Sequence, residues 1–384
     1  MNVPKLRFKE FNDEWIETKI QNVATVIGGG TPSTDEPKYW GNEINWFTPS
    51  EIGKTKYVTI SNRKISQDGL KNSSAKLLPK GTILLSSRAT VGEASILLNE
   101  ASTNQGFQSL IVNENNCNEF IYYLKYKYKR EMLIKSFGST FLEISKSNVE
   151  NIKIKIPSKE EQFLIANFLS LLDKKIELQS KKIEDLKLFK KGLHDKLFNE
   201  VTGNDYLLSD IAIFENGKGH ENIVDENGKY ILINSKFIST EGNVTKKCSE
   251  QLTPLFKNDI TMVMSDLPNG KALAKCYYID ENNKYSLNQR ICKIKIKDDS
   301  IINSKYLFYL LDRNPYYLRF DDGVNQTNLK KDDILSLNLV LPSIKDQERN
   351  SKTLTIIDNF IEKENNKLSK LNLLKKGLMQ SMFV

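Results

Sequence analysis

The sequence has few of the residues on which metal sites and disulfide frameworks depend. Its 384 residues include four cysteines and two histidines, and no two cysteines form a CxxC pair. Thiols this sparse in a chain of this length are typical of a reduced, cytosolic protein. The N-terminal sequence lacks an apolar signal region, and no apolar run approaches the roughly 18 residues of a membrane-spanning helix. We therefore expect a cytoplasmic protein with no metal site and no membrane segment.

Catalytic motifs are absent or incomplete. The glycine-rich residues 28–33 lack the GK[ST] of a P-loop, and we expect a tight loop there that could touch a DNA backbone. Residues 314–317 lack one proline of the Asn-Pro-Pro-aromatic signature of adenine methyltransferases, so a helix-interrupting turn is favoured. Residues 225–229 and 280–284 have the composition of surface turns rather than of nuclease carboxylate clusters. With no Ser/His/Asp arrangement either, the chain is predicted to be non-catalytic.

What the sequence does contain is a long internal repeat, with copies about 185 residues apart. Residues 157–198 and 342–383 align without a gap, agree at about fifteen of roughly 42 positions, and share the phrase KKGL near their ends. Residues 146–158 and 331–343 match in the same register, and each alternates like a strand before meeting a proline. Weaker matches pair 20–24 with 208–212 and 44–52 with 230–238. These matches indicate a duplicated half, a globular module followed by a long helix.

Both repeated helices carry an apolar seam at alternating intervals of three and four, the pattern of a coiled coil. The predicted seam residues are Leu169, Leu172, Ile176, Ile183, Leu186, Leu193 and Leu197, then Leu354, Ile357, Ile361, Leu368, Leu371, Leu378 and Met382. Each helix could span about 40 residues, or about 60 Å, and needs a partner. The pseudo-twofold repeat favours antiparallel pairing with a module at each end. We hypothesise that Lys190 lies near Glu364 and that this charge pair fixes the register; the alternative is a lysine that reaches into solvent.

Each module has the pattern of a mixed α/β domain. In the first, residues 81–85 form a short apolar strand and residues 118–137 an amphipathic helix; in the second, residues 258–264 and 304–320 play the same parts. Four tyrosines between lysines on the first of these helices could stack bases. The favoured interpretation is that they are core residues. They are Tyr122, Tyr123, Tyr126 and Tyr128.

The charge balance tilts mildly toward polyanionic partners. The net charge is +8, from 56 Lys and Arg against 48 Asp and Glu. Many ordinary enzymes are as basic as this, so charge alone decides little.

The architecture resembles the specificity (S) subunit of type I restriction–modification systems over essentially the whole chain. The resemblance lies in two divergent modules, each followed by a repeated helix, and in the phrases GGGTPS at 28–33, YWGNEINWFTPSEI at 39–52, LPKGTILLSSRATVG at 78–92 and TNQGF at 103–107. The second module departs from the first. It shows no counterpart of GGGTPS, and DLPNG at 266–270 stands where RATVG stands in the first copy.

The resemblance implies an α/β (α+β) fold with four parts and no catalytic residue. These are a target-recognition domain over 1–157, a spacer helix over 158–202, a second target-recognition domain over 203–342 and a second spacer helix over 343–384. Each domain would read one half of a bipartite, asymmetric double-stranded DNA target, and the antiparallel helices would set the gap and dock two methyltransferase (M) subunits. Those subunits would bring S-adenosylmethionine, and up to two motor-nuclease (R) subunits would bring ATP and Mg; this chain itself would hold no cofactor.

Basic loop residues are the candidate DNA contacts, because Arg, Lys and His can bind phosphates or read base edges. In the first module they are Lys38, Lys54, Lys56, Arg63, Lys64, Lys71 and Arg88. In the second they are Lys218, His220, Lys236, Lys246, Lys247, Lys271 and Arg290. As a group they favour a phosphate-binding surface, and the alternative for each is a solvated surface charge.

Two other classes of function are alternatives to DNA recognition. One is a stand-alone DNA methyltransferase or nuclease, which the missing catalytic motifs disfavour. The other is a coiled-coil scaffold that does not bind DNA, which the two sizeable, divergent modules disfavour.

Overall fold

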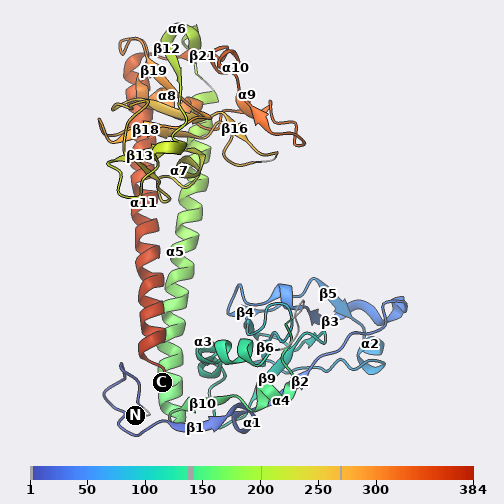
Figure 1. Ribbon diagram of the computed structural model, residues 1–384. Helices are drawn as coiled ribbons and strands as arrows, with labels where there is room; N and C mark the ends of the chain where they lie inside the picture. The colour runs from blue at the N-terminus through green and yellow to red at the C-terminus, as the bar shows by residue number, and fades with distance from the viewer. Residues whose placement is uncertain (1–2, 137–141, 200, 269) are drawn as a thin grey trace. The chain divides into compact units, whose positions relative to one another are not determined.

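The computed structural model describes residues 3–136, 142–199, 201–268 and 270–384, which form two compact units (Figure 1). Unit 1 comprises Met1–Lys181 and Asn366–Val384, and unit 2 comprises Lys182–Asn365. Each unit contains a mixed α/β domain and one half of each long helix. The predicted fold class, two mixed α/β domains with two long helices, is confirmed.

The first half of the chain supplies β1–β10 and α1–α5. Its strands are β1 Ile16–Lys19, β2 Ala24–Gly28, β3 Trp40–Phe47, β4 Tyr57–Val58, β5 Arg63–Ile65, β6 Ile83–Leu85, β7 Ala94–Leu97, β8 Ser102–Thr103, β9 Gln108–Val112 and β10 Lys153–Ile156. Its helices are α1 Ile20–Val23, α2 Gln67–Lys71, α3 Asn118–Ile134, α4 Lys146–Glu150 and α5 Lys159–Asn199, with 3-10 turns at Pro37–Tyr39 and Pro49–Glu51.

The second half supplies β11–β21 and α6–α11. Its strands are β11 Asn204–Leu207, β12 Ala212–Asn216, β13 Tyr230–Ile233, β14 Lys247–Cys248, β15 Ile260–Val263, β16 Ser265–Asp266, β17 Cys276–Tyr278, β18 Tyr285–Leu287, β19 Ile291–Ile296, β20 Thr327–Asn328 and β21 Asn338–Leu341. Its helices are α6 Leu208–Ile211, α7 Ser235–Ser239, α8 Ser304–Leu311, α9 Pro315–Leu318, α10 Lys331–Leu335 and α11 Ile344–Ser381, with a 3-10 turn at Glu221–Ile223.

The two domains share one strand arrangement. The larger sheet of unit 1 has the order β2-β9-β6-β7-β4, and that of unit 2 has the order β12-β19-β15-β17. The register corresponds as well, because Gly28 lies opposite Gln108 and Asn216 lies opposite Cys292. A parallel pair, β3 with β8, recurs as β13 with β18. The duplication therefore extends through the sheets, with β4 as an addition in unit 1.

One helix covers the larger sheet in each unit and supplies much of its core. In unit 1, Phe120 and Tyr128 of α3 are buried in the same apolar cluster as Leu110 of β9. In unit 2, Tyr306 of α8 is buried with Ile294 of β19. Burial of this apolar area is the main stabilising contribution to each domain.

Several local expectations need correction. The helix expected over 118–137 is α3, and Phe137 lies outside the described residues. The helix expected over 304–320 is two helices, because the Asn314 side chain accepts a hydrogen bond from the Tyr316 amide and caps a new helix at Pro315. Residues 146–158 and 331–343 are not continuous strands, since each begins as a short helix, α4 or α10, before pairing as β10 or β21.

The tyrosines of α3 belong mainly to the core. Tyr122, Tyr123 and Tyr128 are buried, and only Tyr126 is substantially exposed. The favoured interpretation as core residues is confirmed for Tyr122, Tyr123 and Tyr128, and the base-stacking alternative remains open only for Tyr126.

The two long helices are antiparallel where they pair (Figure 1). In unit 2, Lys182 pairs with Glu364 at 2.6 Å and Lys190 pairs with Asp358 at 2.5 Å. The residue number rises along α5 as it falls along α11, which fixes the direction. All the predicted seam residues are buried or half-buried. The hypothesised pairing of Lys190 with Glu364 is wrong, because each of these side chains has a different partner.

A lysine inside unit 1 makes stability depend on pH. Lys125 of α3 is 5% exposed, its Nζ donates to the Ala94 carbonyl at 3.2 Å, and it lies over the Tyr122 ring. Burial lowers the pKa of Lys125 to about 8, from the ordinary 10.5. Between these two pH values the unfolded chain holds a proton that the folded chain has released, so raising the pH favours the folded state.

Replacing Lys125 by Met should remove this dependence. From pH 8 to pH 9.5 the wild-type chain should gain about 1–2 kcal/mol of unfolding free energy relative to Lys125→Met, as urea denaturation of both proteins would show. The exposed Lys174→Met is the matched control and should follow the wild type. A difference between wild type and Lys125→Met that stays constant over this range would contradict the expectation.

Candidate nucleic-acid interface

A glycine-rich loop follows β2 in unit 1 and lies against residues 103–107. A Cβ on Gly29 would lie 2.1 Å from the Asn104 carbonyl oxygen, so only glycine fits there. The Gly30 amide donates to the Thr103 carbonyl at 2.9 Å, and the Gly30 carbonyl accepts from the Trp46 indole at 2.9 Å. These backbone groups are engaged within the domain, so the glycines serve close packing of two segments. The sequence phrases GGGTPS, NWF and TNQGF are thereby brought together.

Unit 2 contains the same arrangement, which corrects the expectation that its module lacks a counterpart of GGGTPS. The counterpart is the loop after β12, where a Cβ on Gly217 would lie 2.0 Å from the Asn288 carbonyl oxygen. The Lys218 amide donates to the Leu287 carbonyl at 3.2 Å, as Gly30 does to Thr103. The Asn-Gln dipeptide at 104–105 and 288–289 is the sequence signal that could have revealed this correspondence.

A stacked arginine lies beside the glycine-rich loop of unit 1. The Arg63 guanidinium is 3.7 Å from the Trp40 ring centroid and 5.3 Å from that of Trp46, and the two indoles meet edge to face. The Trp40 indole donates a hydrogen bond to the Ser33 carbonyl at 3.0 Å, which connects the two indole rings to the glycine-rich loop. Among the residues that the structure describes, no carboxylate pairs with exposed Arg63. A guanidinium held on an aromatic face with its edge free is suited to phosphate or guanine.

Two glutamines that the sequence analysis passed over lie at equivalent places in the two units. Gln105 is exposed and accepts a hydrogen bond from the Thr31 hydroxyl. Gln289 is exposed and donates to the Glu221 carboxylate. Amide side chains can hydrogen-bond adenine edges in the major groove, so these residues join the candidate surface. The sequence does not single them out, because an uncharged amide in a loop has no charge or periodicity that separates it from other polar residues.

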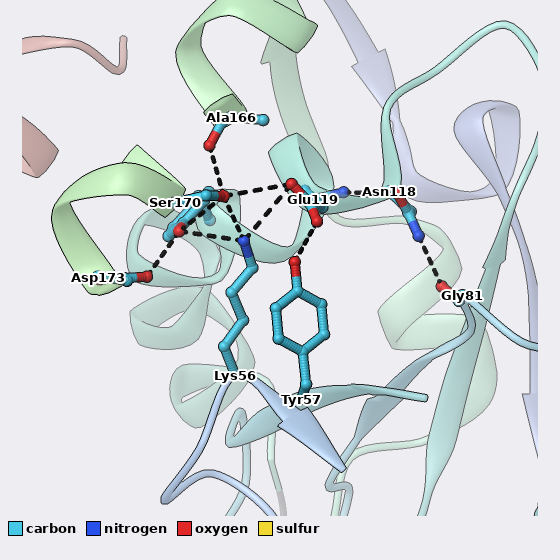
Figure 2. Close-up of polar contacts among 9 residues, drawn as sticks. Lys56, Tyr57, Gly81, Asn118, Glu119, Ala166, Ser170 and Asp173 are labelled. Atoms are coloured by element: carbon cyan, nitrogen blue, oxygen red, sulfur yellow. Dashed lines mark hydrogen bonds and ion pairs between the residues drawn. The ribbon is translucent and has the colours of Figure 1, made fainter. Parts of the chain in front are cut away.

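Lys56, a predicted DNA contact, is engaged inside unit 1 (Figure 2). Its Nζ donates to Ser170 of α5 at 2.5 Å and to the Tyr123 hydroxyl at 3.2 Å, and it lies 3.5 Å from the Glu119 carboxylate. Burial lowers the pKa of Lys56, opposed by the charge of Glu119. Its side chain joins the domain to the long helix, and it leaves little of the ammonium for a ligand.

The other predicted residues of the first module lie at the surface and differ in their ion pairs and exposure. Arg88 pairs with Glu143 at 2.7 Å, and Lys38 lies 3.8 Å from Glu36. Lys64 is half-buried on β5 next to Arg63. Lys54 and Lys71 are exposed.

In the second module one predicted residue is buried and the rest are exposed. His220 is 1% exposed, and its ring nitrogens contact the Lys218 carbonyl and the Ser286 hydroxyl, both at 2.7 Å. It therefore braces the loop after β12 from inside. The exposed residues are Lys218, Lys236, Lys246, Lys247, Lys271 and Arg290.

Neither a metal cluster nor a membrane span emerges from the described ranges. Within residues 3–136, 142–199, 201–268 and 270–384, no group of three or more His, Cys, Asp or Glu side chains could hold a metal ion. None of the helices in that part of the chain is long and apolar enough to cross a bilayer.

Comparison with known proteins yields one family. A family model described as the type I restriction modification DNA specificity domain matches residues 12–188 and 203–373. The specificity subunit of type I restriction enzyme MjaIX from Methanocaldococcus jannaschii is 39% identical over 217 residues, 54% of this chain and 50% of the relative. The EcoR124I/EcoR124II specificity subunit from Escherichia coli is 27% identical over 197 residues, 47% of this chain and 48% of the relative. The chain thus spans about half the length of these curated relatives.

Solved structures share the fold. A crystal structure of the S subunit of a type I restriction-modification system from M. genitalium superposes with a TM-score of 0.65 and 18% identity, covering 100% of this chain and 99% of that one. A chain from a structure of a type I R-M system has a TM-score of 0.60 and 14% identity, covering 96% and 97%.

The close approach at the glycine-rich loops generates a prediction. Gly29→Ala and Gly217→Ala should each lower the unfolding free energy by about 1–3 kcal/mol, because the new methyl group overlaps a backbone carbonyl. Gly192→Ala in α5 is the control: no atom lies within 4 Å of its Cβ position, and it should gain about 0.5–1 kcal/mol. Thermal unfolding of the three variants checks this, and a Gly29→Ala protein as stable as the wild type would contradict the loop geometry.

Proposed function

This chain belongs to the type I restriction–modification DNA specificity family, and on that basis we propose that it is the DNA-recognition subunit of a type I restriction–modification complex. The observation that carries the proposal is the duplication of the specificity domain, matched over 12–188 and again over 203–373. A protein with two copies of one reading domain is suited to a DNA target with two parts. We place it in the cytoplasm, where bacterial and archaeal DNA lies.

The two domains are expected to read different half-sites. They keep the same sheet order and the same glycine-rich loop, which supplies a common frame. The exposed groups on that frame differ, since Lys218 and Arg290 of unit 2 stand where unit 1 has Gly30 and Gly106, whereas unit 1 carries the Arg63–Trp40 stack. Different donors and acceptors on one frame favour an asymmetric, bipartite sequence. The remaining exposed lysines would bind phosphates and position each domain.

The long helices are proposed to set the gap between the half-sites and to dock two methyltransferase subunits. Exposed apolar side chains recur at repeat-related positions on both helices, a feature expected of two equivalent protein-binding surfaces. These pairs are Leu171 with Ile356, Leu188 with Leu373 and Phe189 with Leu374. The docked subunits would bind S-adenosylmethionine and flip one adenine in each half-site for N6 methylation. Up to two motor-nuclease subunits would add ATP- and Mg-dependent translocation and cleavage.

Two other functions are less well supported. A stand-alone methyltransferase or nuclease would need a cofactor motif and a catalytic constellation that the sequence does not supply. A scaffold without a DNA role leaves the conserved frame of two domains with different exposed basic groups unexplained. Binding of S-adenosylmethionine to the isolated chain would favour the first, and the lack of any salt-dependent DNA binding would favour the second.

The decisive experiment is methylation mapping. Co-expression of this chain with its neighbouring methyltransferase subunit in a host without adenine methylation, followed by long-read sequencing, should reveal one bipartite motif. Two short half-sites should flank a fixed gap, with one modified adenine on each strand. An assembled complex that adds no methylation would instead support the scaffold.

The spacer role makes a separate prediction. Inserting four residues, about one helical turn or about 6 Å, into both long helices at opposed positions should lengthen the gap of the motif by one or two base pairs of about 3.4 Å each. The half-site sequences should not change, because the domains are untouched. An active complex whose gap stays the same would rule out this role for the helices.

A further inference from the structure

A polar junction of four side chains occurs in both units and is not required by sequence readout. In unit 1, the Asp173 carboxylate of α5 accepts a hydrogen bond from the Tyr123 hydroxyl of α3 at 2.6 Å. Its other oxygen pairs with Lys375 of α11 at 2.6 Å. The Tyr123 hydroxyl also lies 3.5 Å from the Ser170 hydroxyl. One carboxylate thus holds a helix of the domain and both long helices together.

Unit 2 repeats this junction with equivalent residues. The Asp358 carboxylate accepts from the Tyr309 hydroxyl of α8 at 2.7 Å and pairs with Lys190 of α5 at 2.5 Å. The Tyr309 hydroxyl lies 3.2 Å from the Thr355 hydroxyl. Asp173 and Asp358 are repeat partners, as are Lys375 with Lys190 and Ser170 with Thr355. The same contact is therefore present in both units, although the domains have otherwise diverged.

The junction combines a buried neutral donor with a charged acceptor. Tyr123 is fully buried and its pKa is raised, first by burial and then by its hydrogen bond to Asp173. The hydroxyl therefore stays protonated and remains a donor at any physiological pH. A charge-assisted hydrogen bond of this kind is short and strongly directional, so it specifies an orientation rather than merely adding apolar contact.

Unit 1 adds a further tie from a different part of its domain. Lys56, just before β4, reaches Ser170 and Tyr123, and Glu119 lies beside it (Figure 2). Unit 2 also has a second lysine near its junction besides Lys190. This is Lys305, which belongs to α8 itself and lies over the rings of Tyr278 and Phe308. The body of the unit 1 domain is thus tied to α5 through two segments. Within the described residues of unit 2, the larger sheet has no counterpart of β4.

We propose that Tyr123, Asp173 and Lys375, and their counterparts Tyr309, Asp358 and Lys190, are positioning residues that fix the angle between each recognition domain and the helix pair. This inference rests on the proposed function for its consequence in DNA recognition. If the angle is fixed, only one gap between half-sites brings both domains into register with their bases. If it is loosened, neighbouring gap lengths become acceptable while the bases that are read stay the same.

The test uses Tyr123→Phe in the assembled complex, with Tyr126→Phe as the matched control on the same helix. Tyr123→Phe removes one hydroxyl from the junction, whereas Tyr126 is exposed and meets Lys375 only through its ring, 6.0 Å from Nζ, which Tyr126→Phe keeps. Mapped methylation should show unchanged half-sites and a rise of about tenfold at sites whose gap differs by one base pair, the effect of losing one hydrogen bond to a charged group. A gap distribution equal to that of the control would overturn the proposal, because a merely structural loss would lower methylation uniformly.

A second measurement tests, without DNA, whether the junction fixes the angle between the domain and the helix pair. Spin labels on Lys71→Cys in the domain and Lys174→Cys on α5, both exposed and both in unit 1, report the angle as a distance distribution. Tyr123→Phe should broaden this distribution, and Tyr126→Phe should not. If Tyr123→Phe does not fold, Lys375→Gln, which keeps the buried ring, carries both measurements. A wild-type complex with no bipartite motif would refute the proposed function, while an unbroadened distribution would refute the junction.

Discussion

Each long helix carries a seam too narrow to be stable alone in water, so the two helices must cover one another. They belong to different copies of the repeat, and covering the seam therefore joins distant parts of the chain. The end of α11 enters unit 1, where Phe383 stacks on Phe120 and meets Trp15 edge to face. The Leu6 amide donates to the Ser381 carbonyl in the same unit. Residues 381–383 therefore belong to the core and edge of the α/β domain formed by the first part of the sequence.

Charged groups at this seam need explanation, because removing charges from water costs free energy. Asp358 and Lys190 offset that cost by pairing with each other, and the Tyr309 hydroxyl satisfies the second carboxylate oxygen. A leucine pair could fill the same space, but it would not bind a tyrosine of the domain at a defined angle. The retained charges are thus best explained by orientation, and their exact recurrence in unit 1 is consistent with a duplicated ancestor in which the contact already existed.

The two units share their helix–domain contacts but differ in the exposed residues around their glycine-rich loops. A second buried contact, Gln162 with the Cys117 amide and Gln347 with the Asn303 amide, again joins a long helix to the start of a domain helix at 2.9 Å in both units. The glycine-rich loops likewise keep their close approach while the residues around them change. The residues that join each domain to the long helices are the same type or similar in both units. In contrast, Arg63 and Trp40 are found only in unit 1, and Arg290 only in unit 2. In the proposed function, this separation would allow the DNA sequence that is read to vary without disturbing assembly.

The sequence predicts the duplication, the apolar seams, the mixed α/β modules and the family, because periodic apolar residues and a gapless repeat are properties of local order. It did not reveal that Lys56 and His220 face inward, or that Lys190 meets Asp358 rather than Glu364. It also hid the equivalence of Gly217 with Gly29, since loops of different composition can make the same backbone approach. Those points were decided only by the tertiary structure, because the burial and partner of a side chain depend on segments far away in the chain. The sequence around a lysine or histidine does not show whether its side chain is solvated or buried.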